Sequence, residues 1–115
     1  MSTKRIDKTE NMSKAVEHGG IVYLAGMTAD DNSVSMKKQT EQVLSKIDGY
    51  LAKAGTDKSK LLAATVYISD MSQKAAMNEA WISWIDGANP PTRACVAVEL
   101  GSPKTLVEIV VTAAK

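Results

Sequence analysis

Two charged residues interrupt apolar segments near the C-terminus and are the first candidates for chemistry. Arg93 begins the segment Arg93–Glu99, and Glu108 lies inside Leu106–Ala113. A buried charge is costly unless it is paired, so each side chain needs a partner or a ligand. If the two segments are neighbouring or near-neighbouring strands, the guanidinium and the carboxylate could line one pocket. Side chains on opposite faces of the sheet would contradict this expectation. The pattern alone favours the alternative of a structural ion pair, or of two strand-end residues that reach water.

Few other residues have the chemistry of a catalytic group. Cys95 lies one pleat beyond Arg93 on the same face, where it could contact a ligand or be a small buried apolar residue. The single histidine, His18, stands beside Gly19-Gly20 in an expected turn, so no obvious base activates the thiol. No spacing of ligands suggests a metal site, and no glycine-rich phosphate loop is present. We therefore expect no metal and no cofactor.

Composition narrows the class of protein. The chain has 115 residues, 44% of them hydrophobic, and a net charge of +1 with scattered basic residues, which predicts one globular domain over residues 1–115 and no nucleic-acid partner. A lone cysteine is typical of a reducing compartment. The polar N-terminal segment has no signal-peptide core, and no apolar run approaches the length of about 20 residues that spans a membrane. A cytoplasmic location without membrane attachment is the expectation.

The elements that must position these residues follow from periodicity. Strands are expected at Thr3–Ile6, Ser13–Glu17 and Ile21–Ala25, with a loop over Gly26–Ser35. A helix is predicted for Met36–Ala54, capped by Ser33 or Ser35 and ended by Gly55. Its apolar stripe comprises Val43, Leu44, Ile47, Leu51 and Ala54.

The second half predicts a strand at Leu61–Ser69 and then a helix capped by Asp70, with Gln73 as capping-box partner, that ends near Gly87. Met77, Trp81 and Trp84 form its apolar stripe and are interpreted as core or interface residues. The two charged segments named above close the chain as strands. The result is an α+β domain with a mixed or antiparallel sheet and two helices on one face. Because several strands are apolar on both faces, self-association is expected to cover the second face.

Several segments resemble the RidA (YjgF) family of reactive-intermediate, enamine/imine deaminases, most closely its smaller YoaB-like members. The most specific pieces are Pro91-Thr92-Arg93-Ala94-Cys95-Val96 and the later Val107-Glu108-Ile109. Weaker pieces are Ser13-Lys14-Ala15-Val16, Val22-Tyr23-Leu24-Ala25-Gly26 and Met77-Asn78-Glu79-Ala80-Trp81. The similarity extends over nearly the whole chain. It implies a chorismate-mutase-like fold, and a homotrimer whose sheets form a central barrel with three clefts between subunits.

The resemblance also implies hydrolysis of imino acids such as 2-aminoacrylate to 2-keto acids and ammonia, without metal or cofactor. Arg93 would clamp the substrate carboxylate and Glu108 would hold or deprotonate the attacking water. The Cys95 backbone would bond the imine nitrogen or the water. The remaining expected contacts are Gly26, which permits close approach, the polar cleft residue Asn78, and Met12.

Departures from the family pattern concern the expected pocket. Met12 stands where the family has Tyr, Ala25 where Ser is usual, and Met27 where a polar residue is common. The sequence thus predicts a more apolar pocket, which would prefer bulkier imino acids or have lost activity. Two alternatives to a deaminase remain: a module that binds a small carboxylate such as a 2-keto acid without turnover, and a stress-related interaction protein that acts through its surface.

Overall fold

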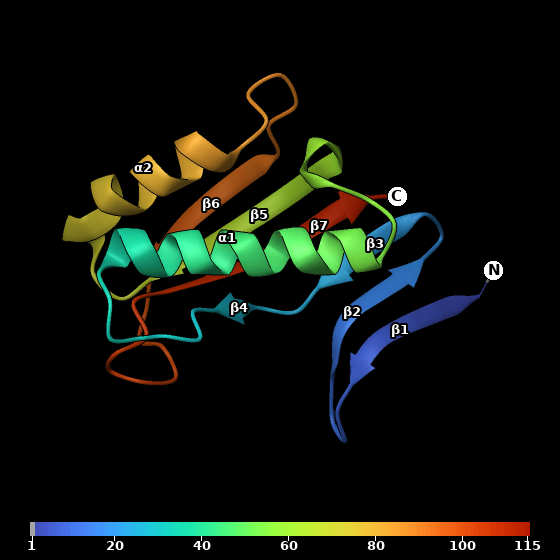
Figure 1. The fold of residues 1–115 in the computed structure, drawn as a ribbon, viewed down its shortest axis with the longest axis horizontal. Helices are drawn as coiled ribbons and strands as arrows, with labels where there is room; N and C mark the ends of the chain where they lie inside the picture. Colours follow the sequence, from blue (N-terminus) through green and yellow to red (C-terminus); the bar gives the residue numbers. More distant parts are fainter. Residues whose placement is uncertain (1) are drawn as a thin grey trace.

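A mixed β-sheet with two helices on one face organises the protein, as the computed structural model of residues 2–115 shows (Figure 1). The strands of this described part are β1 (Thr3–Lys8), β2 (Ser13–His18), β3 (Ile21–Leu24), β4 (Met27–Thr28), β5 (Leu61–Ile68), β6 (Thr92–Ala97) and β7 (Val107–Ala114). The helices are α1 (Met36–Lys53) and α2 (Lys74–Trp84), with short 3-10 turns at Lys58–Lys60 and Met71–Gln73. The predicted α+β class is confirmed. The short strand β4 falls in a segment predicted as loop, so that part of the prediction is wrong.

Strand order explains where the two charged segments lie. The strands follow one another as β1-β2-β3-β7-β5-β6, and β4 also pairs with β7. All pairs are antiparallel except β5 with β6, which are parallel because α2 carries the chain back across the sheet. The last two strands are therefore near-neighbours with β5 between them. β6 is an edge strand in the single chain, whereas β7 is central.

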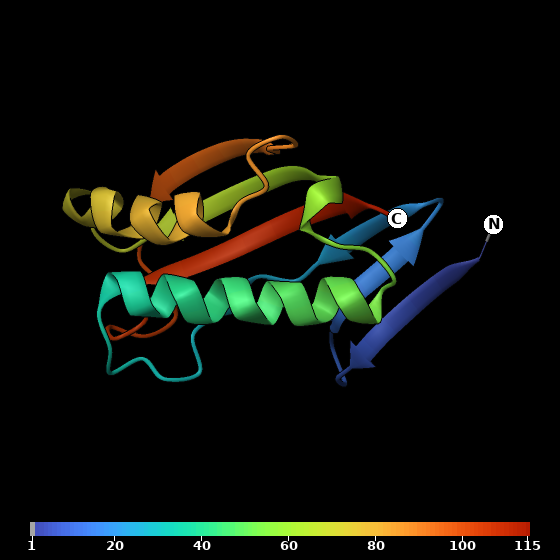
Figure 2. The same cartoon turned by 45° about the horizontal axis from the view of Figure 1, so that its top comes forward.

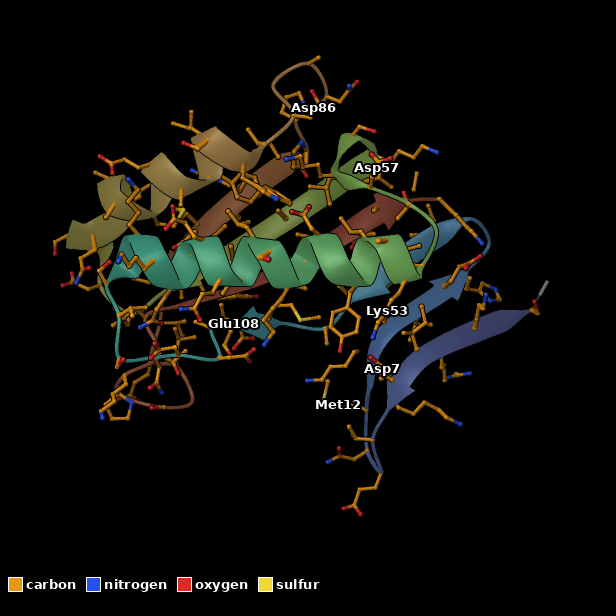
Figure 3. The ribbon with its side chains drawn as sticks, in the orientation of Figure 1. Asp7, Met12, Lys53, Asp57, Asp86 and Glu108 are labelled. Carbon is orange, nitrogen blue, oxygen red and sulfur yellow. The ribbon has the colours of Figure 1, made fainter. Side chains whose placement is uncertain are left out.

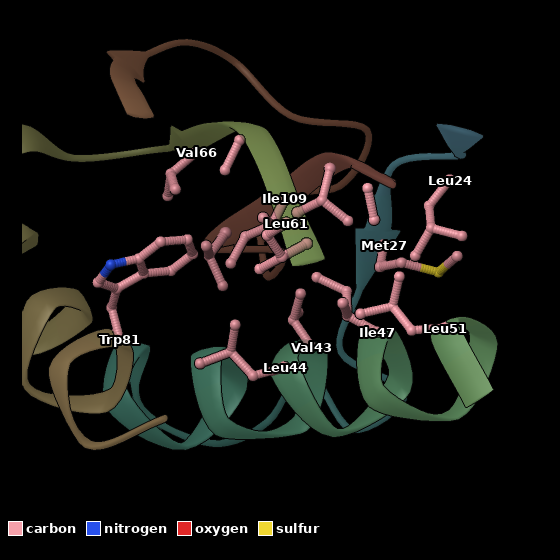
Figure 4. Close-up of a cluster of buried hydrophobic side chains, with 14 of the residues drawn as sticks. Leu24, Met27, Val43, Leu44, Ile47, Leu51, Leu61, Val66, Trp81 and Ile109 are labelled. Atoms are coloured by element: carbon pink, nitrogen blue, oxygen red, sulfur yellow. The ribbon is translucent and has the colours of Figure 1, made fainter. Parts of the chain in front are cut away.

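Both helices pack on the same face, where they build the hydrophobic core (Figure 2). The sheet contributes alternate residues, so that β7 buries Val107, Ile109, Val111 and Ala113 and leaves the residues between them partly accessible. From α1, the predicted stripe is buried as expected (Figure 4). Met77 and Trp81 of α2 join the same cluster. Within residues 2–115, no helix is both long and apolar enough to cross a membrane.

Local capping fixes the ends of the helices. The Ser35 side chain accepts a hydrogen bond from the Lys38 amide at 3.3 Å, and Gly55 follows α1 with a φ of 81°, which glycine adopts without strain. Asp70 caps differently from the prediction. Its carboxylate accepts from the Ser72 amide at 2.9 Å and so caps the 3-10 turn that precedes α2, while Gln73 makes no side-chain capping bond.

No helix or strand of residues 2–115 covers the other face of the sheet. The molecule measures 44 × 37 × 20 Å, and its thickness is that of one sheet and one layer of helices. Tyr23 is 50% exposed and Val96 is 41% exposed on this uncovered face. The same face also includes residues of β5, β6 and β7, namely Ala63, Thr65, Tyr67, Ala94, Glu108, Val110 and Thr112. An apolar surface of this kind is typical of an interface.

Candidate functional site

Arg93 lies on the helix-covered face, at the sheet edge, where three side chains of α2 surround its guanidinium. Nη1 donates a 2.7 Å hydrogen bond to Oδ1 of Asn78 and lies 3.9 Å from Sδ of Met77. The guanidinium carbon stands 5.3 Å from the centroid of a Trp81 ring, within cation–π range. No carboxylate among the described residues pairs with Arg93, and its Nε and Nη2 have no acceptor there. A half-buried cation therefore keeps donors available for an external anion.

Cys95 is next to Arg93 on the same face of β6. Arg93 is level with Ala64 of β5, and Cys95 is level with Val66, both of which point into the core. The Cys95 side chain is partly buried and packs against the core cluster. Its surroundings are those of a small apolar residue beside a cation, and no base accompanies the thiol. The edge position of β6 leaves one side of its backbone without a strand partner in the single chain.

Glu108 projects from β7 onto the uncovered face, next to Gly26. A Cβ placed on Gly26 would overlap the Glu108 carboxylate and would lie 2.9 Å from its Cδ. Only a residue without a side chain leaves room for the carboxylate in this position. Within residues 2–115, Glu108 makes no hydrogen bond or ion pair through its side chain. The carboxylate is partly buried and available to a ligand or a water molecule.

The expectation that Arg93 and Glu108 line one pocket of a single chain is wrong. Tyr67 of β5 is level with Glu108 on one side and with Val96 on the other, so these three side chains share the uncovered face. Arg93 is three positions before Val96 and points the opposite way, because successive side chains alternate between the faces. The structure brings Arg93 together with Asn78 and Cys95, and Glu108 together with Gly26, in two separate places.

The remaining residues of the expected pocket are dispersed. Met12 lies between β1 and β2 and is 43% exposed (Figure 3). Met27 is 2% exposed because it points into the core opposite Ile109, so it cannot make a pocket on the uncovered face more apolar. Ala25 is partly buried and pairs through its backbone amide with the Lys14 carbonyl. The expected turn comprises Gly19 and Gly20 alone: His18 is the exposed last residue of β2, where its Nδ1 lies 2.7 Å from Oγ1 of Thr3.

Surface depressions and shifted ionisable groups occur elsewhere. One depression of about 250 Å³ lies between α1 and α2 beside Trp84, and another of about 420 Å³ lies along residues 98–103. Neither is lined by Arg93 or Glu108. The carboxylates of Asp31, Asp57, Asp70 and Asp86 have lowered pKa values because each accepts hydrogen bonds within its own turn. No three His, Cys, Asp or Glu side chains of residues 2–115 gather as a metal site would require.

Trp81 is, with Met77, a contact of Arg93 that the interpretation of the sequence missed. The sequence predicts the Trp81 ring to lie in the core or an interface, and it is only 7% exposed, yet it also stacks on the guanidinium. A signal was available: Met77 and Asn78 stand four and three residues before Trp81 on the helix that precedes Arg93, and both spacings make a residue a neighbour of Trp81 on the helix surface. A helix side that combines an amide with an indole suits a cation better than it suits pure core packing.

Comparison with known proteins agrees with the fold over its full length. The sequence model of the family described as Endoribonuclease L-PSP matches residues 2–115. A RutC family protein of Haemophilus ducreyi is 47% identical over 110 residues, which cover 96% of this chain and 94% of that protein. The RutC family protein YoaB of Escherichia coli is 36% identical and covers 99% of both chains. The crystal structure of a YjgF family member from Neisseria meningitidis superposes with a TM-score of 0.97 at 37% identity, covering 100% of this chain and 96% of that one. The chain therefore belongs to this RutC/YjgF family, the RidA family that its strand motifs resemble.

Proposed function

We propose that the protein hydrolyses reactive enamine or imine intermediates of amino acids to 2-keto acids and ammonia. The observation that carries the proposal is the Arg93 guanidinium, which α2 holds in place and which has free donors and no acidic partner among the described residues. Such a group suits the carboxylate of a small amino-acid derivative, which it can bind through two parallel hydrogen bonds. Membership of the family supports the same class of substrate.

The proposed reaction adds water across a carbon–nitrogen double bond. The water oxygen attacks the imine carbon, and the resulting carbinolamine releases ammonia as the carbon–oxygen double bond of the keto acid forms. Glu108 holds the water, takes one of its protons and passes it to the imine nitrogen. It then takes the hydroxyl proton of the carbinolamine and gives it to the amine as the carbon–nitrogen bond breaks. Arg93 fixes the carboxylate, and thereby the position of the imine carbon. An enamine such as 2-aminoacrylate enters this sequence as its imine tautomer.

In this proposal the site forms between copies of the chain, because one chain holds Arg93 and Glu108 on opposite faces of the sheet. The apolar uncovered face and the unpaired edge of β6 are the surfaces through which copies would associate. A homotrimer with its sheets inside and its helices outside would bring the β6 edge of one copy near β7 and Gly26 of the next. Each cleft would then combine Arg93, Asn78 and Cys95 with Glu108 and Gly26 of a second copy.

A second candidate function is binding of a 2-keto acid without turnover, and it rests on the same guanidinium. It would need Arg93 but not Glu108. The description of the matching family model also names ribonuclease activity, which no residue arrangement here favours. The chain has one histidine, His18, which is exposed at the end of β2 and hydrogen-bonded to Thr3, and its basic residues are dispersed.

The test is a coupled assay in which an amino-acid oxidase generates imines in place and keto-acid formation is followed above the spontaneous rate. Wild-type protein is expected to accelerate hydrolysis, and Arg93→Ala and Glu108→Gln are each expected to remove the acceleration while the far-ultraviolet circular dichroism stays unchanged. Binding of pyruvate that requires Arg93, without any acceleration by the wild type, would replace the deaminase with the binding module. Comparing small and bulky imines tests the expected preference for larger substrates, and equal rates would remove it.

A further inference from the structure

The guanidinium of Arg93 is held at two points that leave one edge free. Asn78 accepts from Nη1 at 2.7 Å, and the Trp81 ring lies under the guanidinium with its centroid 5.3 Å from Cζ. The two nitrogens without an acceptor among the described residues, Nε and Nη2, lie on the same edge of the guanidinium plane. Two parallel N–H groups on one edge match the spacing of carboxylate oxygens.

Trp81 is itself rigidly placed. It is 7% exposed and belongs to the core cluster, and its ring is 5.7 Å from that of Trp84, which in turn donates from Nε1 to Asp48 of α1 at 2.9 Å. A ring fixed in this way determines the plane of a cation stacked on it, because the attraction is strongest over the ring face. The hydrogen bond to Asn78 orients the guanidinium but does not neutralise its charge, because the amide is uncharged. The guanidinium therefore stays available to an external anion.

We propose that Trp81 is a positioning residue for substrate recognition: by stacking, it sets the plane of the Arg93 guanidinium and so presents the Nε–Nη2 edge to the carboxylate of an imino or keto acid. This rests on the role of Arg93 in the proposed function. It predicts that an aromatic ring is needed at this position and that apolar volume alone is insufficient. Trp84 offers a matched control, because it is the second tryptophan of α2 and has no recorded contact with Arg93.

The experiment measures pyruvate affinity by isothermal titration calorimetry, together with the unfolding midpoint of each variant in urea. Trp81→Leu is expected to weaken binding about two- to tenfold, because the guanidinium is then no longer fixed in the free protein and must lose its rotamer freedom on binding. Trp81→Phe is expected to retain affinity within about threefold, because its ring still has a negative face. Trp84→Leu removes a neighbour of Trp81 but leaves the ring under Arg93 in place, so it is expected to weaken binding less than Trp81→Leu does, even where it lowers the urea midpoint as much.

A double substitution separates positioning from general damage to the core. In an Arg93→Lys background, which keeps the charge but lacks the planar fork, Trp81→Leu is expected to change affinity by less than about twofold. If Trp81→Leu weakens pyruvate binding in the Arg93→Lys protein as much as it does in the wild type, Trp81 acts only through the packing of the core. That result would overturn the proposal. If Trp81→Leu fails to fold, Trp81→Met supplies the unbranched non-aromatic variant for the same cycle.

The outcomes distinguish the two proposals. If Arg93→Ala binds pyruvate as the wild type does, or the wild type does not bind it, the proposed role of Arg93 fails and the positioning role fails with it. If Arg93→Ala loses binding while Trp81→Leu keeps it, only the positioning role of Trp81 is wrong. If Trp81→Leu loses affinity for pyruvate and Trp81→Phe retains it, the result supports both the role of Arg93 and the positioning role of Trp81.

Discussion

At the scale of single residues, Arg93 and Glu108 show two ways of keeping a charge inside an apolar strand. Arg93 is stabilised by neutral neighbours, an amide oxygen at 2.7 Å and an indole face, which satisfy part of the guanidinium without cancelling its charge. Glu108 is given space by Gly26 and has no recorded side-chain partner among the described residues. A structural ion pair would have brought the two charges into contact. Their separation leaves both free to interact with a ligand.

Gly26 provides the first prediction at this scale. We expect Gly26→Ala to lower deaminase turnover by about 100-fold, because the new Cβ would displace the Glu108 carboxylate from the position in which we propose that it holds the attacking water. Steady-state kinetics measure the loss, and circular dichroism checks the fold. The matched control is Gly49→Ala, whose Cβ would meet no atom within 4 Å. In the interior of α1 it should leave turnover unchanged and raise the free energy of unfolding by about 1 kcal/mol. Unchanged turnover in Gly26→Ala would show that the carboxylate position is unimportant.

At the scale of elements, one buried glutamine joins three segments around the start of β7. Gln39 of α1 is fully buried, and its Nε2 lies 3.1 Å from the Val34 carbonyl and 3.0 Å from the Lys104 carbonyl. Its Oε1 accepts from the Leu106 amide at 3.0 Å. These bonds tie the loop before α1 to the strand that carries Glu108. The side chain thus replaces the water that these backbone groups would otherwise need.

We therefore expect Gln39→Ala to lower the free energy of unfolding by about 2–4 kcal/mol, because several buried backbone groups lose their partners at once. Urea unfolding followed by tryptophan fluorescence measures the change. Gln42→Ala is the control, since the same residue type on the same helix accepts a single, exposed bond from the Asp31 amide at 3.0 Å. Gln42→Ala should lower the free energy of unfolding by no more than about 1 kcal/mol. Equal costs for the two variants would contradict the role of Gln39 as the connecting residue.

The attachment of β1 to α1 should depend on pH. Lys53 donates to Asp7 at 2.9 Å and, with Tyr50, lowers the pKa of that carboxyl below its ordinary value of 3.8. A carboxyl with a lower pKa in the folded state stabilises the fold above pH 3.8 and loses this contribution as the pH falls through the folded-state value. We expect carboxyl-carbon NMR to give a titration midpoint for Asp7 below 3.8, and Lys53→Met to move it upward. A midpoint that does not respond to Lys53→Met would show that the ion pair is absent in solution.

Periodicity in the sequence predicts the elements well, since an amphipathic stripe or an alternating strand is a local property. It places α1, β5 and the Arg93–Cys95 face of β6 correctly, with ends that differ by one or two residues from those of the structure. Whether Arg93 and Glu108 share a face depends instead on the register between β6, β5 and β7. That register is set by pairing over long distances, and a shift of one residue reverses the face. The short strand β4 was also missed, because two residues carry no periodic signal.

At the scale of the whole molecule, the uncovered face of the sheet predicts association in solution. We expect sedimentation velocity to show a trimer for the wild type and smaller species for Val96→Glu, because a carboxylate on this face would lose its hydration when copies associate. Val96 is 41% exposed there. Ile82→Glu is the control, since Ile82 is 70% exposed on α2 and belongs to the outer helical layer of the proposed trimer. Dissociation by both variants, or by neither, would contradict an interface formed by the sheet.

Because Arg93 and Glu108 lie on opposite faces of the sheet in one chain, the site proposed between copies makes a specific prediction. Two variants that are each inactive should regain activity when they assemble into the same trimer. If each cleft takes Arg93 from one copy and Glu108 from the next, mixed trimers of Arg93→Ala and Glu108→Gln contain clefts in which both groups are intact. Random assembly of equal amounts makes about one cleft in four intact, so co-expressed variants should show about one quarter of wild-type turnover. Each variant alone should be inactive, and so should a mixture of Arg93→Ala with the double variant that carries both substitutions. If both residues act from the same copy, no mixture can regain turnover, and the site between copies must be abandoned.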